Sequence, residues 1–230
     1  LKAGGDLSAL ALSANLNAPA IDMAGRGLSD LAVALTATAD PKAPKAQVKA
    51  PGKIDGQAID ISTDVLSEGG QTTLPSIKAN VGNNSLTGHV ALSESFAPTG
   101  ALTFDLPDLS LIAALAGQKA EGDLKGSVDI TDDAGKIGLK VAATGSGLKQ
   151  GNFAIVSPNV DVTVTDLSAF AATGAIKADE VASGTNKIDS LAVNFTQLGN
   201  RTNFSLDGYY DNHPLVAGGG VETNDGTTLV

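Results

Sequence analysis

Cysteine and tryptophan are both absent from the 230-residue chain, and aromatic residues make up only 3% of it. Without cysteine, the chain can form no disulfide framework, no thiolate zinc site and no cysteine nucleophile. The two histidines, His89 and His213, lie far apart in the sequence, and neither has a partner at metal-ligand spacing. The sequence therefore predicts no metal site, and its lack of cysteine fits a bacterial periplasmic or surface protein.

Long apolar runs are missing as well. The longest run, around Leu109 to Ala116, is far shorter than the roughly 20 residues that a helix needs to cross a bilayer. No signal peptide is visible, and the chain begins at Leu1 without a methionine. The last segment, "VETNDGTTLV", ends just as the strand after its turn begins. We interpret the sequence as a fragment of a longer protein.

Positive charge is scarce: 15 Lys and Arg residues stand against 25 Asp and Glu residues, so the formal net charge is −10. An excess of negative charge disfavours nucleic acid and anionic membrane surfaces as direct partners, since phosphates would be repelled. Hydrophobic residues make up 42% of the chain, so Ala, Val, Leu and Ile must build most of the interior. A thin or elongated sheet needs fewer large aromatic side chains than a compact core does.

Turn signals recur along the chain at intervals of about one strand pair. Gly, Asn and Asp supply the positive φ angles that tight hairpin turns require. Strands of roughly 6–10 residues at this spacing predict an antiparallel meander. The expected turns lie at Gly82-Asn83-Asn84, Asp132-Asp133-Ala134-Gly135, Gly199-Asn200, Asp211-Asn212 and Asp225-Gly226.

Between these turns, apolar residues alternate with Lys, Asp, Asn, Ser and Thr. This pattern is typical of antiparallel strands with one apolar face and one face in water. We expect the apolar residues to line a hydrophobic groove that contacts lipid. The candidates are Leu86, Val90, Leu92, Leu102, Phe104, Val128, Ile130, Ile137, Leu139, Val141, Val160, Val162, Val164, Leu191, Val193, Phe195, Phe204 and Leu206.

Residues 39–56 interrupt the alternation, since the surrounding segment contains Pro41, Pro44 and Pro51 together with a cluster of lysines. Proline cannot donate to a strand ladder, so we expect an edge, a long loop or a linker here. The predicted organisation is amino-terminal strands in 1–38, a Pro/Lys-rich loop or linker in 39–56, and a groove segment in 57–230.

One short helix is expected within "PDLSLIAALAG". Asp108 is a suitable N-cap and Gly117 follows the last residue of helical spacing, which are start and stop signals. A helix of about eight residues is too short to be stable alone in water. It must therefore lay Leu109, Ile112 and Leu115 on an apolar surface, either as a simple cover or as a plug in an open groove.

Motifs for catalysis are absent. The glycines of "GSGLKQG" at Gly145–Gly151 have the wrong spacing for a dinucleotide loop, and a strand pattern follows them. Asp132-Asp133 precede Ala-Gly, as turn residues do. Nothing places a serine nucleophile on a strained elbow. The sequence predicts no enzyme, no catalytic residue and no cofactor.

Two stretches resemble the TamB family, the translocation and assembly module subunit, and related AsmA-like bridge proteins. They are "ALTFDLPDLSLIAALAGQKAEGDLKGSVDITDDAGKIGLKVAATGSGL" (Ala101 to Leu148) and "KIDSLAVNFTQLGNRTNFSLDGYYDNHPLVAGGGV" (Lys187 to Val221). The shared features are the "dL..la.l.g" segment, followed by glycine and leucine at the family's spacing. No catalytic residue is carried over by this resemblance.

The resemblance implies an all-β fold, namely an elongated, mostly antiparallel, U-shaped sheet (a β-taco) with an apolar concave groove. It implies a periplasmic bridge in a Gram-negative bacterium, anchored in the inner membrane and reaching an outer-membrane TamA-type barrel protein. The expected function is to guide phospholipid between the membranes, to support outer-membrane protein assembly, or both. Expected partners are phospholipid acyl chains, the TamA-type barrel and outer-membrane β-proteins, with no nucleic acid.

Two other interpretations of the same alternation remain open. Exposed strand edges could pair with incoming outer-membrane β-proteins, as a chaperone does by β-augmentation. Alternatively, the alternating residues could pack a closed core in a structural or adhesive β-solenoid. These interpretations differ in whether the apolar face stays accessible after folding.

Overall fold

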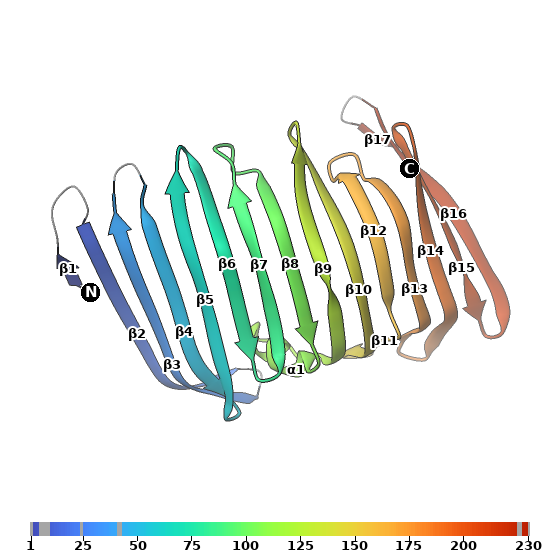
Figure 1. The fold of residues 1–230 in the computed structure, drawn as a ribbon. Helices are drawn as coiled ribbons and strands as arrows, with labels where there is room; N and C mark the ends of the chain where they lie inside the picture. Colours follow the sequence, from blue (N-terminus) through green and yellow to red (C-terminus); the bar gives the residue numbers. More distant parts are fainter. Residues whose placement is uncertain (1, 5–9, 24, 41–42, 225–226, 230) are drawn as a thin grey trace. The chain divides into compact units, whose positions relative to one another are not determined.

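The computed structural model describes residues 2–4, 10–23, 25–40, 43–224 and 227–229. Over these residues the chain is almost entirely β-strand, its strand pairs are antiparallel, and it contains one short helix (Figure 1). The predicted all-β, antiparallel fold class with a single short helix is confirmed. The chain divides into two compact units, residues 1–119 (unit 1) and 120–230 (unit 2).

Unit 1 is a meander in which each strand pairs with the next one along the chain. Its last strand is followed directly by helix α1. The bounds are β1 Lys2–Gly4, β2 Leu10–Met23, β3 Arg26–Ala39, β4 Lys45–Ile54, β5 Gln57–Glu68, β6 Gln71–Val81, β7 Asn84–Leu92, β8 Pro98–Leu106 and α1 Leu109–Leu115.

Unit 2 follows the same principle with one elaboration. Strand β10 pairs with β9 on one side and with both β11 and β12 on the other, and β13 in turn pairs with both of these short strands. The bounds are β9 Glu121–Asp133, β10 Lys136–Gln150, β11 Phe153–Val156, β12 Asn159–Asp166, β13 Ala171–Ser183, β14 Asn186–Leu198, β15 Arg201–Tyr210, β16 His213–Asn224 and β17 Thr227–Leu229.

Four of the five predicted hairpin turns are confirmed. Gly82 has φ +58°, Ala134 and Gly135 have φ +52° and +86°, and Asp211 and Asn212 have φ +49° and +59°. Two consecutive positive φ angles match the right-handed twist of the flanking strands. The turn at Gly199-Asn200 also joins two paired strands. The fifth turn, at Asp225-Gly226, lies outside the described residues.

Helix α1 starts and ends where its signals predict. The Asp108 carboxylate accepts a hydrogen bond from the Ser110 amide at 3.0 Å, and Gly117 follows the helix with φ +67°. The buried stripe is shifted, however, because the fully buried residues are Leu111 and Ala114, whereas Ile112 and Leu115 pack only partly.

The predicted loop or linker over 39–56 is wrong, because Lys45–Ile54 form strand β4, paired with β3 and β5. Pro51 pairs with Asp60 and lies opposite an interruption in the β3–β4 ladder, between the pairs Ala34–Lys49 and Ser29–Lys53. A residue without an amide hydrogen is tolerated where the ladder is already broken. The chain accordingly divides near residue 119 and has no boundary at 38.

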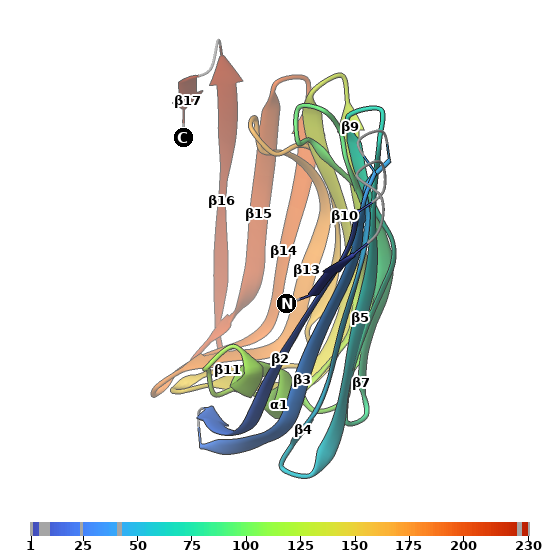
Figure 2. The same ribbon diagram turned by 90° about the vertical axis from the view of Figure 1, so that its left-hand side faces the viewer.

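The strands are bent, as Figure 2 shows for the lower ends of β2 and β3 in unit 1 and of β13 and β14 in unit 2. Several ladders contain a register shift, one of them between Asp189 and Ala192, and such bulges bend and twist a strand. Gly174 is a position in unit 2 where two strands approach each other too closely for a side chain. It has φ +123°, and a Cβ there would lie 2.1 Å from the Asp161 carbonyl oxygen.

Gly174→Ala should lower the free energy of unfolding by about 2 kcal/mol or more, because the added Cβ meets backbone and the φ angle disfavours an L residue. Urea denaturation followed by circular dichroism measures the change. Thr173→Ala, at the neighbouring exposed position, is the control and should stay within about 0.5 kcal/mol of the parent. Equal effects of the two changes would contradict the role given to Gly174.

Candidate functional site: two apolar sheet faces

The ladder registers place the apolar residues of unit 1 on one face of its sheet. Residues paired directly across antiparallel strands have side chains on the same face. One row crosses five strands and is entirely apolar: Ala50, Ile61, Ala79, Leu86 and Phe104. The unit 1 candidates Val90, Leu92 and Leu102 alternate with the members of this row and share its side of the sheet. We call this side the apolar face of unit 1.

Unit 2 is built in the same way. One row runs through Val128, Val141, Val162, Gly174, Phe195 and Phe204. A second row runs through Val160, Ile176, Val193 and Leu206. The remaining candidates, which are Ile130, Ile137, Leu139, Val164 and Leu191, occupy the same side by pairing or by alternation along their strands. We call this side the apolar face of unit 2.

The opposite side of each sheet is polar. In unit 1, Lys49 pairs with Ser62, which pairs with Lys78, and Thr87 and Thr103 continue the row. In unit 2, Asp161 occupies the row that continues to Asn194 and Ser205. One side of each sheet thus carries polar and charged groups that water can solvate.

The apolar faces are only partly covered by protein. All eighteen candidate side chains are half-buried, and none is fully buried. Other members of the two faces are more open, since Leu16, which pairs with Val33, is 67% exposed and Ile176 is 37% exposed. A face packed against a second layer would bury most of these side chains. Each face is therefore covered mainly by its own neighbouring side chains.

Sequence reasoning missed part of the apolar face of unit 1. Ile61 and Ala79 belong to the row of Leu86, and Val48 and Ile77 belong to the next row. The signal was present, because residues 59–65 alternate as "IDISTDV". The prolines nearby had directed the interpretation of the preceding segment toward a linker.

One end of the apolar face of unit 1 is fully covered, and α1 is the cover. Six of the buried hydrophobic residues form a single cluster here. Helix α1 lies at the lower end of the molecule in Figure 2. Leu111 and Ala114 of α1, at 1% and 2% exposure, belong to the same cluster as Ile54, which has no exposed surface. The strand residues of the cluster are Leu28, Ile54, Ile59 and Val81. Gly82 gives α1 room, because a Cβ there would lie 3.1 Å from Leu111 Cδ1.

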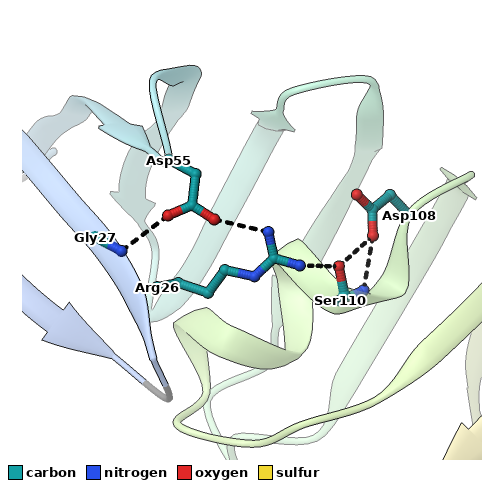
Figure 3. Close-up of polar contacts among 5 residues, drawn as sticks. All are labelled: Arg26, Gly27, Asp55, Asp108 and Ser110. Atoms are coloured by element: carbon teal, nitrogen blue, oxygen red, sulfur yellow. Dashed lines mark hydrogen bonds and ion pairs between the residues drawn. The ribbon is translucent and has the colours of Figure 1, made fainter.

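Polar contacts hold α1 in place on unit 1 (Figure 3). Arg26 donates to the Asp55 carboxylate at 2.7 Å with one nitrogen and to Ser110 Oγ at 2.6 Å with another. Ser110 Oγ in turn donates to Asp108 at 2.5 Å. We call these four residues the α1 clasp. The buried Asn84 side chain accepts from the Asp108 amide at 2.9 Å, so the helix start is also tied to the β6–β7 turn.

The stability of the α1 clasp depends on pH, because Asp55 must be ionised to pair with Arg26. The hydrogen bond from Arg26, followed by that from the Gly27 amide, holds the pKa of Asp55 below its ordinary value of 3.8. A carboxyl whose pKa is lowered by folding stabilises the folded state while it is ionised. Its contribution is present above the ordinary pKa and is lost as pH falls through the lower folded pKa.

Unit 2 has an apolar row near its β13–β14 turn without a comparable cover. Leu148 pairs with Ile155, Ile155 with Val181, and Val181 with Ile188. All four are half-buried, and the described part of unit 2 contains no helix. This row is half-buried without a helix, whereas the cluster in unit 1 is fully buried beneath one. The comparison indicates that α1 causes the burial of the unit 1 cluster.

Two hollows in unit 1 lie at the end of its sheet away from α1. One, of about 260 Å³, is lined in part by Ala37, Ala46 and Val65 from the apolar face. The other, of about 660 Å³, is lined mainly by the polar side, including Thr36, Gln47 and Asp64. None of the eighteen candidate residues lines either of these two hollows.

The residues rejected as catalytic occupy structural positions. Asp132 caps its turn by accepting from the Gly135 amide at 2.8 Å. His213 Nδ1 lies 2.7 Å from the Asp211 carbonyl oxygen, and His89 is exposed. The segment 145–150 belongs to strand β10. Within the described ranges, no three His, Asp or Glu side chains gather as metal ligands would.

Among the residues that the structure describes, no helix has both the length and the apolar character needed to cross a membrane. No protein-family model, curated protein or solved structure matches the chain. The two apolar faces and the covered end of unit 1 are therefore interpreted from their own chemistry.

Leu111→Ala should lower the free energy of unfolding by about 2–5 kcal/mol, because it removes buried methyl groups and leaves a cavity under α1. Thermal or urea denaturation measures the loss. Leu86→Ala, at a half-buried position of the same unit, should cost clearly less and serves as the comparison. A smaller effect at Leu111 than at Leu86 would argue against α1 as the cover of a packed cluster.

Lowering the pH below 3.8 and through the lowered pKa of Asp55 should loosen α1 before it affects the sheets, because Asp55 then loses its charge and with it the ion pair to Arg26. Amide hydrogen exchange at residues 109–115 follows the change. Asp55→Asn should weaken protection of α1 at neutral pH and remove its acid dependence. Unchanged acid dependence in this variant would rule out Asp55 as the titrating group.

Proposed function

We propose that the apolar faces of units 1 and 2 bind the acyl chains of phospholipids and guide them along the sheets. The observation that supports this is the state of the candidate side chains, which share one face in each unit and remain half-buried after folding. Side chains left in this state by the protein itself gain further burial when an apolar molecule covers them.

The energetic requirement for such a surface is large. Exposing an acyl chain to water costs roughly 0.8 kcal/mol per CH₂ group. A phospholipid with about 30 such groups therefore faces a barrier on the order of 20 kcal/mol when it leaves a membrane. An apolar sheet face several strands wide removes much of this barrier, because the chains exchange one apolar environment for another.

The composition of the apolar faces suits movement of a lipid along them more than binding of a lipid at one fixed position. Val, Leu, Ile and Ala dominate both faces, and the rows crossing them contain no charged residue between Ala50 and Phe104 or between Val128 and Phe204. Apolar attraction between aliphatic groups is non-directional, so no single position holds the lipid strongly. The strands of unit 1 bend at the end that α1 covers, so the sheet is curved there (Figure 2).

The setting proposed for this activity is the periplasm of a Gram-negative bacterium. It rests on the resemblance of residues 101–148 and 187–221 to TamB-like and AsmA-like proteins. In that setting the chain is a segment of an inner-membrane-anchored bridge that leads to a TamA-type outer-membrane barrel. Lipid delivery along such a bridge would serve outer-membrane biogenesis and, through it, outer-membrane protein assembly.

Val162→Arg should lower the amount of phospholipid that the protein retains and leave the fold intact, because an arginine on the open face of unit 2 can reach water but repels acyl chains. Mass spectrometry of lipid retained after reconstitution from detergent measures binding, and circular dichroism measures folding. Thr173→Arg, on the polar side of the neighbouring strand, is the matched control and should keep its lipid.

Ile54→Arg is the second control, because Ile54 has no exposed surface in the cluster under α1. A buried, unpaired charge should unfold that region. If Val162→Arg unfolds unit 2 in the same way, the face is a closed core, and a structural or adhesive role replaces lipid binding. A parent protein that retains no phospholipid after reconstitution also contradicts the proposal.

A further inference from the structure

The cluster under α1 continues the apolar face of unit 1. Ile59 lies two residues before Ile61 on β5, and Val81 lies two residues after Ala79 on β6, so alternation places both on the side of the apolar row. Ile59 and Val81 also pair with each other, and Ile61 packs directly against the cluster. The apolar face therefore extends from the open part of unit 1 to the residues that α1 covers.

Helix α1 presents to this cluster the same chemistry as an acyl chain. Leu111 and Ala114 are fully buried in the cluster, and Ile112 and Leu115 pack partly against it. All four side chains are aliphatic, so their attraction to the cluster is non-directional and does not depend on the helical backbone. An acyl chain offers the same aliphatic groups to the same surface.

The segment that carries α1 lies between two strand ladders. Among the described strand pairs, β8 pairs with β7 up to Asp105, and β9 pairs with β10 from Glu121 onward. Residues 107–120 lie between these ladders, so α1 can move without breaking either of them. A helix of seven residues also has little stability of its own. The position of α1 therefore depends on its contacts with unit 1.

The polar contacts that hold α1 are accessible to water. The paired side chains of Arg26 and Asp55 are 33% and 37% exposed. Arg26 reaches from this pair to Ser110 on α1 (Figure 3). Exposed ion pairs and single hydrogen bonds each contribute little net stability. The α1 clasp is therefore weak enough to open reversibly.

We infer that α1 is a displaceable plug and that the cluster beneath it becomes a site for an acyl chain when α1 lifts. The strand residues that line this site are Leu28, Ile54, Ile59 and Val81. The inference rests on the proposed function and adds to it a second, covered site and the clasp that controls it. A ligand that binds only the open state shifts the population toward that state, so lipid and α1 compete for the cluster.

Arg26→Ala tests the control by the clasp, because it removes both contacts that Arg26 makes there. The probe is phosphatidylcholine that carries a photoreactive diazirine near the end of one acyl chain. Cross-links to residues 54–59 should increase at least about threefold over the parent protein, because the site is open for a larger fraction of the time. Cross-links to residues 160–164, on the apolar face of unit 2, should stay the same and serve as the internal reference.

Lys53→Ala is the matched control. Lys53 pairs with Asp30 at 3.0 Å, and the two side chains are 54% and 64% exposed. The substitution removes one positive charge from unit 1, as Arg26→Ala does, but it leaves the α1 clasp intact. Cross-links of this variant to residues 54–59 should equal those of the parent protein. An increase equal to that of Arg26→Ala would overturn the inference, because the effect would then be one of charge.

The absence of cysteine allows the clasp to be closed covalently. Arg26→Cys and Ser110→Cys, combined in one protein, should give the high cross-linking of Arg26→Ala while the two thiols are free. Joining the thiols with a short bismaleimide should return cross-linking at residues 54–59 to the level of the parent protein. Cross-linking that stays high after joining would show that this end of unit 1 has unfolded, and would overturn the inference.

Amide hydrogen exchange at residues 109–115 reports directly on α1. Loading the parent protein with phosphatidylcholine should lower the protection of these amides, while protection of the β5–β6 ladder should not change. Unchanged or increased protection of α1 in the loaded protein would show that the helix is a permanent cover, and would overturn the inference.

Lipid retention separates this inference from the proposed function. If the parent protein retains phosphatidylcholine but cross-links to residues 54–59 do not increase in Arg26→Ala, only the inference about α1 fails. If neither protein retains phosphatidylcholine or forms cross-links at residues 160–164, the proposed function fails as well.

Discussion

An apolar sheet face without a second protein layer is the constraint on which the rest of this structure depends. In an ordinary β-sandwich, two such faces cover each other and exclude water. Here the side chains of each face find partners mainly beside them on the same sheet, as Val162 does between Val141 and the backbone of Gly174. The backbone ladders, together with these lateral contacts, must therefore provide most of the stability.

The low aromatic content of the chain, 3%, and the glycines on its apolar faces follow from that constraint. Large aromatic rings fill the space between two layers, and a single layer has no such space. Glycines on the apolar faces find a similar explanation. Phe204 lies over Gly219, where a Cβ would come within 2.7 Å of the ring, and Leu102 lies over Gly88 in the same manner. A large side chain thus covers the backbone of its small neighbour and keeps the face smooth.

Where the protein does cover its own face, it uses both apolar and polar contacts. Helix α1 has seven residues, too few for independent stability. Burial of Leu111 and Ala114 provides an apolar contribution, and the α1 clasp fixes the direction of the helix. Arg26 links the β2–β3 turn to Ser110, and Asp55 links the β4–β5 turn to Arg26. Three segments far apart in the sequence are joined at one end of unit 1.

The sequence predicted the hairpins and the helix ends better than it predicted how the chain divides into units. Alternation and turn residues were sufficient for the strands on either side of the four confirmed turns, because each hairpin is determined by a few neighbouring residues. The N-cap at Asp108 and the stop at Gly117 are equally local signals. Pro51 led to the wrong prediction of a linker, because a proline is tolerated there only through a bulge in β3, and no residue near Pro51 in the sequence indicates that bulge.

The half-burial of the eighteen candidate side chains is the part of the candidate site that could not be predicted from the sequence, because the same alternation suits an open face and a closed core.

The acidic charge of the chain and its apolar faces are compatible because they occupy different sides of each sheet. A protein that handles lipid in water must avoid both aggregation through its apolar surface and irreversible adsorption to membranes. Negative charge on the polar side opposes both, since copies of the chain repel one another and anionic bilayers repel the chain. Under the proposed function, lipid would therefore be attracted by the apolar faces alone, because the rows that cross them carry no charged side chain.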